Sequence, residues 1–259
     1  MSQPRATKVL VIGYVWPEPR SSAAGGHMMQ ILETFLEQGW DITFSSPAGT
    51  GEHRADLTAL GIREVPIELN NSSFDSFISQ LAPDVVLFDR FMMEEQFGWR
   101  VEQQCPDALR VLETSDLQSL RDARHLRLKE RLKASDDADD FSELFAKALR
   151  AEFEFMAGTD LAKREIAAIY RCDLNLMISD VEIELLVEQF KVPRNLLHGC
   201  PLMVDLPSAP PAAFEDRAHF LSIGNFRHAP NWDAVLWMKT TLWPLIREQL
   251  PSAQLHIYG

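Results

Sequence analysis

Apolar residues near the start of the chain form two different patterns, a continuous run followed by a helical spacing. Residues 9–12 are apolar without alternation, which is typical of a parallel strand covered on both faces. From residue 28 onward, apolar residues recur at steps of three and four, which predicts one buried helical stripe made of Met28, Ile31, Leu32, Phe35 and Leu36. Gly39 is expected to end this helix, because glycine adopts a positive φ at little cost. The pattern predicts a strand–loop–helix unit at the amino end of an α/β domain.

Two glycines, Gly25 and Gly26, stand where this helix should begin. Backbone without side chains can approach a phosphate closely, and a helix N-terminus offers unpaired N–H groups and the positive end of its dipole. We therefore interpret the pair as an anion-binding loop. The alternative is an ordinary βα turn in which glycine only avoids strain.

Apolar runs and amphipathic segments continue to alternate as far as residue 112. The expected strands cover residues 41–45, 64–69, 84–88 and 109–112, and the expected helices cover residues 74–81 and 94–104. This alternation predicts a mostly parallel sheet with right-handed crossovers, in which ligands collect beyond the carboxyl ends of the strands. The segments in that position are 13–26, 89–91 and 113–116.

A long, charged, helical stretch at residues 117–170 interrupts the alternation. Its first half carries six basic residues, Arg121, Arg124, Arg127, Lys129, Arg131 and Lys133. They precede an acidic run, Asp136, Asp137, Asp139 and Asp140. The basic part could lie on an anionic membrane surface, whereas the alternative is a solvated helix whose opposite charges pair with each other.

The second half of the chain returns to strand and helix patterns. Strands are expected at 173–178 and around 196–197, with a helix between them that begins with the capping-box residues Ser179 and Glu182. The proline- and alanine-rich segment 206–216 is interpreted as a linker between domain 1–205 and domain 217–259. The expected elements after it are a strand at 220–223, a loop at 224–231, a helix from Trp232 and a strand at 255–258. Two strands and one helix are too few to enclose a core.

Composition narrows the class of protein. The 259 residues carry a net charge of −13, from 25 basic and 38 acidic residues, which disfavours nucleic-acid binding driven by overall charge. The cysteines Cys105, Cys172 and Cys200 lack metal-ligand spacing and are interpreted as free thiols in a reducing cytosol. The first apolar run is too short for a signal peptide, and no stretch is long enough to cross a membrane. A cytoplasmic location is expected.

The order of segments resembles the GT-B-fold glycosyltransferases, specifically the retaining family four, also called group 1. The resemblance rests on VIGYVWPEPRSSAAGGHMMQILETFLEQGWDITFSSP, CDLNLMISDVEIELLVEQFKVP and FLSIGNFRHAPNWDAVLWMKTTLWPLIREQLPSAQLHIYG. It covers nearly the whole chain and implies a Rossmann-like N-terminal domain followed by the incomplete beginning of a second Rossmann-like domain. It also implies transfer of a sugar from a nucleotide-sugar donor to a hydroxyl acceptor, with retention, and without a metal or other cofactor.

The resemblance also assigns candidate donor-phosphate residues. In the family, the glycine loop after the first strand faces the donor diphosphate, which places Gly25 and Gly26 there. A basic loop after the first strand of the second domain supplies further contacts, which here implies Gly224, Arg227, His228 and Asn231. Arg227 could instead be a solvent-facing arginine. Asn231 stands near the place of a typical lysine, and it could instead be a helix N-cap.

The family often has a histidine at the end of the strand that here ends at Leu112. This chain has Glu113 and Ser115 there instead, and Asp116 remains as the candidate catalytic residue, able to bind a hydroxyl or orient the acceptor. Its alternative role is the N-cap of the following helix. Asp89 and Arg90, after the fourth strand, could simply pair with one another.

Donor recognition in this family also uses an acidic motif deep in the second domain, which would lie beyond Gly259. Efficient turnover by these residues alone is therefore not expected. A non-catalytic binding or assembly module derived from the same fold is the main alternative, and a sugar-nucleotide epimerase is a third. The sequence does not predict which sugar or acceptor is used, nor the oligomeric state.

Overall fold

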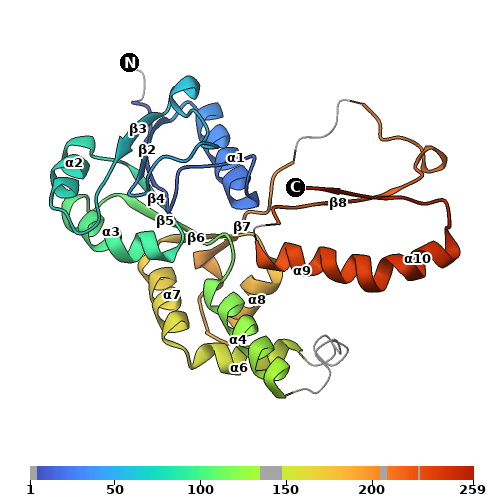
Figure 1. The fold of residues 1–259 in the computed structure, drawn as a ribbon. Coiled ribbons are helices and arrows are strands. Elements are labelled where there is room, and N and C mark those ends of the chain that lie inside the picture. The colour runs from blue at the N-terminus through green and yellow to red at the C-terminus, as the bar shows by residue number, and fades with distance from the viewer. Residues whose placement is uncertain (1–4, 135–147, 205–208, 227) are drawn as a thin grey trace. The chain divides into compact units, whose positions relative to one another are not determined.

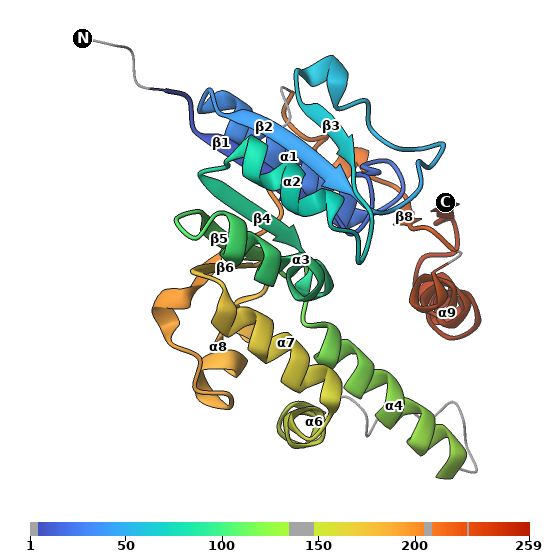
Figure 2. The same cartoon turned by 90° about the vertical axis from the view of Figure 1, so that its left-hand side faces the viewer.

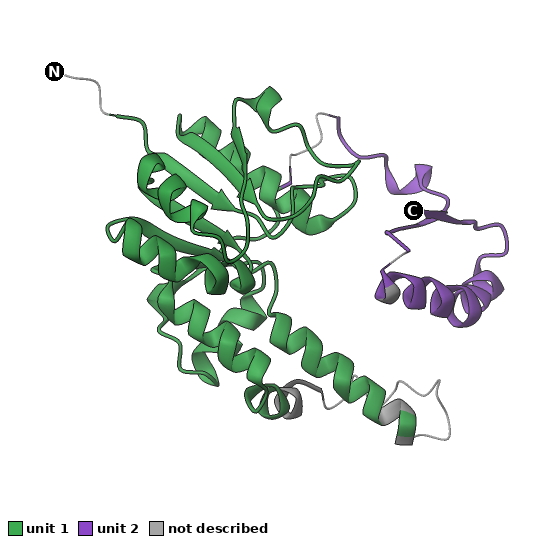
Figure 3. Cartoon of the chain, turned by 60° about the vertical axis from the view of Figure 1, so that its left-hand side comes forward, with its two compact units in different colours: residues 1–203 green, residues 204–259 purple. Residues whose placement is uncertain are grey.

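The structure is a computed structural model that describes residues 5–134, 148–204, 209–226 and 228–259. The chain divides into two compact units, residues 1–203 and residues 204–259 (Figure 3). Each unit is described by itself. Arg227, one of the candidate phosphate-binding residues, lies outside the described residues.

Unit 1 is built on one seven-stranded sheet in the order β3-β2-β1-β4-β5-β6-β7 (Figure 1). Every strand pair in it is parallel. Its strands are β1 Lys8–Ile12, β2 Asp41–Ser46, β3 Arg63–Pro66, β4 Val85–Asp89, β5 Leu109–Glu113, β6 Leu174–Met177 and β7 Leu197–Gly199. The predicted parallel α/β sheet is confirmed, although β3 is shorter than the expected segment 64–69 because its pairing with β2 ends at Pro66.

Helices cover both faces of this sheet (Figures 1 and 2). They are α1 Ala23–Glu37, α2 Ser73–Leu81, α3 Phe91–Gln104, α4 Gln118–Ala134, α6 Ala148–Ala157, α7 Asp160–Arg171 and α8 Asp180–Glu188, with the short 3-10 helices η1 Thr58–Leu60 and η2 Arg194–Leu196. One apolar core contains α1 side chains and the other contains side chains of α2, α3, α7 and α8. None of the helices in the described part of the chain is both long enough and apolar enough to span a bilayer.

Apolar and polar residues do not alternate along β1, because helices cover both faces of the sheet. Leu10 and Ile12 belong to the core with α2 and α3, whereas Val9 and Val11 belong to the core with α1. Successive side chains of a strand point to opposite faces, so both sets must be apolar when both faces are covered.

Helix α1 forms much as its sequence predicts. Ser22 is the N-cap, and its hydroxyl accepts a hydrogen bond from the backbone N–H of Gly25 at 3.0 Å. Met28, Ile31 and Leu32 are buried, and Gly39 has a φ of 70°, as expected for the residue that ends the helix.

The prediction of a capping box at the start of α8 is half correct. The Ser179 hydroxyl accepts from the N–H of Glu182 at 3.4 Å, as in that motif. The Glu182 carboxylate does not return to Ser179; it accepts from the N–H of Leu117 at 3.3 Å, at the start of α4. A long-range partner has replaced the local one.

Unit 2 has a two-stranded parallel sheet of β8 Phe220–Ile223 and β9 Leu255–Tyr258, at the predicted positions. Between the strands lie α9 Ala229–Trp237, a π-helical turn η4 Met238–Leu242 and α10 Trp243–Gln249, and η3 Phe214–Asp216 precedes β8. Within the described part of unit 2, the buried hydrophobic residues are Val235 and Ala253, and large apolar side chains such as Leu221 and Trp232 are exposed. Two strands bury too little area for a core of their own.

Candidate active site at the carboxyl ends of the strands

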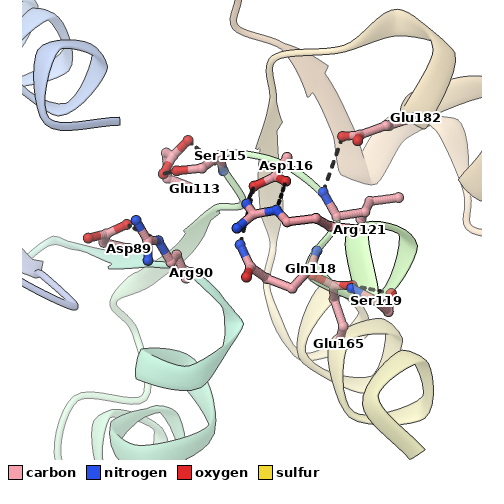
Figure 4. Close-up of polar contacts among 11 residues, drawn as sticks. Asp89, Arg90, Glu113, Ser115, Asp116, Gln118, Ser119, Arg121, Glu165 and Glu182 are labelled. Atoms are coloured by element: carbon pink, nitrogen blue, oxygen red, sulfur yellow. Dashed lines mark hydrogen bonds and ion pairs between the residues drawn. The ribbon is translucent and has the colours of Figure 1, made fainter. Parts of the chain in front are cut away.

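The strand order of the sheet reverses between β1 and β4. The loops that follow these two strands therefore lead to helices on opposite faces of the sheet. In open α/β sheets, ligands bind in the crevice that such a reversal opens. The residues at this place are Tyr14, Asp89 and Arg90. The neighbouring strand β5 adds Glu113, which lies near Asp89 and Arg90 in Figure 4.

Asp89 ends β4 and its carboxylate is buried. It accepts a hydrogen bond from the N–H of Tyr14 at 3.0 Å. The pKa of Asp89 is raised to about 6, mainly by burial and to a smaller extent by the nearby Glu113 charge, whereas the Arg90 charge opposes the shift. A carboxyl group with a pKa near neutrality can take up or release a proton at physiological pH.

Arg90 has an unusual backbone, with φ 70° and ψ 153°. Its N–H donates to the carbonyl of Glu113 at 2.8 Å, and its guanidinium lies over the Tyr14 ring at 4.9 Å. Its Nε is 3.7 Å from Asp89 Oδ1, so the expected pairing of Asp89 and Arg90 is confirmed. A non-glycine residue in this conformation is strained, and such residues concentrate at functional sites.

A buried histidine reaches the end of β5 from α1. His27 is 1% exposed, and its Nδ1 is 3.4 Å from Oε1 of Glu113, which is 2% exposed. The Glu113 carboxylate also accepts from the N–H of Ser115 at 2.8 Å and from its hydroxyl at 3.0 Å. The strand end therefore does have a histidine beside it, although the histidine comes from a distant part of the sequence.

Carboxylates from distant parts of the chain accept hydrogen bonds from the backbone N–H groups at the start of α4. Glu165 accepts from the N–H of Gln118 at 2.9 Å and from the N–H of Ser119 at 3.0 Å, and it also binds the Ser119 hydroxyl. Burial raises the pKa of Glu165, and it raises the pKa of Glu182 to about 7. Because these two carboxylates take the amides of residues 117–119, the alternative role of Asp116 as N-cap is wrong.

Asp116, the candidate catalytic residue, lies at the edge of this cluster. Its Oδ2 accepts from Nε of Arg121 at 2.7 Å, a second guanidinium nitrogen binds Oδ1, and Gln118 Nε2 donates to Oδ1 at 3.2 Å (Figure 4). Its side chain is 36% exposed. Its role in catalysis stays a prediction.

A cavity of about 390 Å³ adjoins the Asp116–Arg121 pair. It is lined by Phe91 and Met92 of α3, by Gln118, Arg121, Asp122 and His125 of α4, and by Leu161 and Arg164 of α7. The Arg164 guanidinium lies 5.5 Å from the centre of the Phe91 ring. It also forms a bidentate pair with the Glu95 carboxylate, with hydrogen bonds of 2.8 and 2.6 Å. The lining of the cavity combines apolar side chains with guanidinium groups, which suits a small ligand that has both apolar and acidic parts.

The two glycines of the α1 loop have different surroundings. A Cβ placed on Gly25 would lie 2.5 Å from the carbonyl oxygen of Glu18, so close backbone packing alone explains glycine at this position. A Cβ placed on Gly26 would have no atom within 4 Å. Gly26 thus borders open space in the first turn of α1, where a phosphate could approach.

In unit 2, the loop after β8 brings three of the candidate phosphate-binding residues together. The Asn231 amide donates to the carbonyl of Asn225 at 3.1 Å and would lie 3.1 Å from a Cβ on Gly224. His228 is the N-cap residue of α9, and Asn231 lies inside the first turn, so the alternative role of Asn231 as N-cap is wrong. Asn231 instead closes the loop that precedes the helix.

The described residues contain no group of three or more histidine, cysteine or acidic side chains that could hold a metal ion. No family model matches the sequence, and no curated protein matches it significantly.

Solved structures do match the chain. The lipopolysaccharide outer core galactosyltransferase WaaB, in its apo form, superimposes with a TM-score of 0.52 at 13% identity, over 98% of this chain and 61% of that chain. Sucrose-phosphate synthase from Thermosynechococcus elongatus gives 0.55 at 13% identity, over 98% and 62%. A glycosyltransferase from Rickettsia africae ESF-5 gives 0.50 at 10% identity, over 99% and 69%.

The chain has the fold of the GT-B glycosyltransferases. The predicted fold class, a Rossmann-like α/β domain of the GT-B type, is confirmed. The chain spans about three fifths of the length of the first two of these structures, 61% and 62%.

Sequence reasoning missed His27, Glu165 and the cavity. His27 directly follows Gly25 and Gly26, and its polar side chain on an otherwise apolar helix face was the available signal. Glu165 has no such local signal, because its partners are 46 and 47 residues away in sequence.

Proposed function

We propose that this chain is part of a glycosyltransferase that moves a sugar from a nucleotide-sugar donor to a hydroxyl acceptor. One observation supports this most: at least 98% of the chain superimposes on three solved structures whose names are those of sugar-transferring enzymes. We further propose transfer with retention and without a metal, which rests on the resemblance to family four.

The chemistry that this function needs is stabilisation of a leaving nucleoside diphosphate. Negative charge grows on the diphosphate as the glycosidic bond breaks, so fixed donors around it lower the barrier. In unit 1, Gly26 in the first turn of α1 borders open space, so we assign the close approach of the diphosphate to this residue, whose own N–H donates to the carbonyl of Ser22 at 3.1 Å. For unit 2, taken by itself, the resemblance to family four makes Gly224, His228 and Asn231 the proposed phosphate-binding residues.

We assign the acceptor to the cavity between α3, α4 and α7. Its size is that of a small-molecule site, and Phe91 and Leu161 would contact an apolar part of the acceptor. Arg121 and Arg164 would bind an acidic group, in exchange for their present partners Asp116 and Glu95. Asp116, once released by Arg121, would be able to accept a hydrogen bond from the acceptor hydroxyl.

Isothermal titration with UDP-, GDP- and ADP-sugars tests the donor part of the proposal. We expect one of them to bind, and we expect Gly26→Val to abolish the binding because a side chain would occupy the place of the phosphate. Gly49→Val is the matched control, since a Cβ on Gly49 also has no atom within 4 Å.

Three other outcomes are informative. If affinity survives in Gly26→Val, the glycine pair is structural only. If none of the three sugar nucleotides binds, the non-catalytic module is the better interpretation. If the donor sugar is converted without any acceptor, the chain is an epimerase instead.

A further inference from the structure

The thiol of Cys200 ends a row of three polar side chains inside unit 1. Cys200 Sγ is 3.7 Å from Nε2 of His27, and Nδ1 of the same imidazole is 3.4 Å from Oε1 of Glu113. The three residues come from the segment after β7, from the first turn of α1 and from the end of β5. A thiol, an imidazole and a carboxylate in this order form an activated nucleophile when the imidazole can hold the proton of the thiol.

Hydrogen bonds fix the positions of Glu113 and Cys200, the two ends of the row. Glu113 is held by two hydrogen bonds from Ser115, and its position leaves the imidazole of His27 with Nε2 directed at the sulfur. The N–H of Cys200 donates to the carbonyl of Met177 at 2.7 Å, next to β7. Three residues further on, the N–H of Met203 donates to the side-chain oxygen of Gln30 at 3.0 Å. Hydrogen bonds thus attach the segment that carries the thiol to β6 and to α1.

The charges around the row favour an imidazolium. The contact with Cys200, and next to it the contact with Glu113, raise the pKa of His27 to about 9, although burial opposes the shift. Among the described residues, charged groups near the row include Asp89, beside Glu113, and Asp180 of α8, whose carboxylate is 3.7 Å from a Cβ placed on Gly199. A cation in contact with a thiol favours the thiolate, which is the nucleophilic form.

The other two cysteines provide a comparison within the same chain. Burial raises the pKa of Cys105 and strongly raises that of Cys172. Cys172 is buried, whereas Cys200 is partly exposed. Low reactivity is therefore expected of Cys105 and Cys172.

We propose that Cys200 is a modification site, a thiol that His27 activates toward peroxides. The sulfur attacks one peroxide oxygen, the O–O bond breaks, and the hydroxide that leaves takes the proton held by His27. With hydrogen peroxide, the products are a sulfenic acid and water, so the sulfur is oxidised and the peroxide is reduced. The reaction uses no sugar nucleotide, and it stands independently of the proposed transferase function.

The test measures the alkylation rate of each cysteine in the folded chain with iodoacetamide, from pH 6 to pH 8, by peptide mass spectrometry. At pH 7 we expect Cys200 to react at least about ten times faster than Cys105 and Cys172, with a rate that changes little over this range. In His27→Gln we expect the Cys200 rate at pH 6.5 to fall about ten-fold and to rise about ten-fold per pH unit, as for a free thiol. Exposure alone would give fast labelling without the flat pH profile, so a wild-type rate that rises ten-fold per unit overturns the proposal.

Two further variants keep the test valid if His27→Gln does not fold. Glu113→Gln retains the imidazole but removes its anionic partner, and we expect an intermediate rate with a partly restored pH slope. Cys200→Ser should fold and lose the label. After treatment with hydrogen peroxide, a sulfenic-acid trap should mark Cys200, and marking of Cys105 or Cys172 in its place would contradict the assignment.

Discussion

Asp89 illustrates how burial can change the chemistry of a residue. Its carboxylate has a hydrogen bond from Tyr14 and a guanidinium nearby, and yet its pKa is raised from 3.8 to about 6. The folded state therefore holds the proton more tightly than the unfolded state does. The resulting contribution to stability is fully present below pH 3.8 and is lost as the pH rises through about 6.

Replacing Asp89 by asparagine should stabilise the protein at pH 7.5. The neutral amide keeps an acceptor for the Tyr14 N–H and removes the buried charge, so we expect a gain of about 2 kcal/mol at pH 7.5 and little change at pH 4. Urea unfolding at the two pH values measures the difference. Asp41→Asn, at an exposed position, is the control and should change neither value; a loss of stability in Asp89→Asn at pH 7.5 would show that its negative charge is needed.

At the scale of single residues, sequence reasoning succeeded where the cause was local. The positive φ of Gly39 follows from its place after a helix, and the pairing of Asp89 with Arg90 follows from their adjacency. His27 could not be interpreted in this way, because its partner Cys200 is 173 residues away. Contacts at that distance depend on strand order, which only the folded sheet fixes.

The loop and first turn of α1 allow a prediction at the scale of an element. Gly25→Ala should destabilise the protein by about 2 kcal/mol, because the new methyl group would collide with the Glu18 backbone. Gly26→Ala should instead stabilise it by about 0.5–1 kcal/mol, because alanine restricts the unfolded chain and favours the helix. Thermal unfolding of the two variants, measured side by side, tests the pair, and equal effects would contradict the structure around Gly25.

The start of α4 depends on a carboxylate from a distant helix. Glu165→Ala would leave the amides of Gln118 and Ser119 buried without their acceptor, and we expect a loss of about 2–3 kcal/mol in the free energy of unfolding. Glu95→Ala is the matched control: its ion pair with Arg164 is partly exposed, so its loss should cost less than about 1 kcal/mol. Similar losses in both variants would mean that Glu165 does not cap α4.

The elements themselves were largely predictable from periodicity, whereas their ends were less so. Helix α3 begins at Phe91 rather than at residue 94, because the sharp turn at Arg90 starts it directly after β4. Helix α9 begins at Ala229 rather than at Trp232, with Pro230 in its first turn. In both cases a special backbone residue, not the apolar pattern, decides the boundary.

The two units differ in how many hydrophobic side chains they bury. Unit 1 has two apolar cores, one on each face of its sheet, whereas the described part of unit 2 buries only Val235 and Ala253 among its hydrophobic residues. Local opening should therefore be much easier in unit 2. The alternation of strands and helices predicted the sheet of unit 1, but the cavity could not be predicted, because it depends on how the helices α3, α4 and α7 pack against one another.

Hydrogen exchange followed by mass spectrometry can test this difference across the whole molecule. We expect amides of β8 and β9 to exchange at least about 100-fold faster than amides of β1 and β4. Peptides covering residues 8–12 and 255–258 provide the comparison. Equal protection in both would mean that unit 2 is stabilised by contacts other than those within it.

The parallel arrangement of the seven-stranded sheet has a consequence for synthesis of the protein. No two of its neighbouring strands can be joined by a tight hairpin, so each pairing must wait for a full crossover. The strand β1 pairs with β2 on one edge and with β4 on the other. At about 5–20 residues per second, roughly 2–10 s pass on the ribosome between the emergence of β2 and that of β4. For that time one edge of the buried strand β1 is open in the nascent chain, and a chaperone that covers this edge would prevent its pairing with another chain.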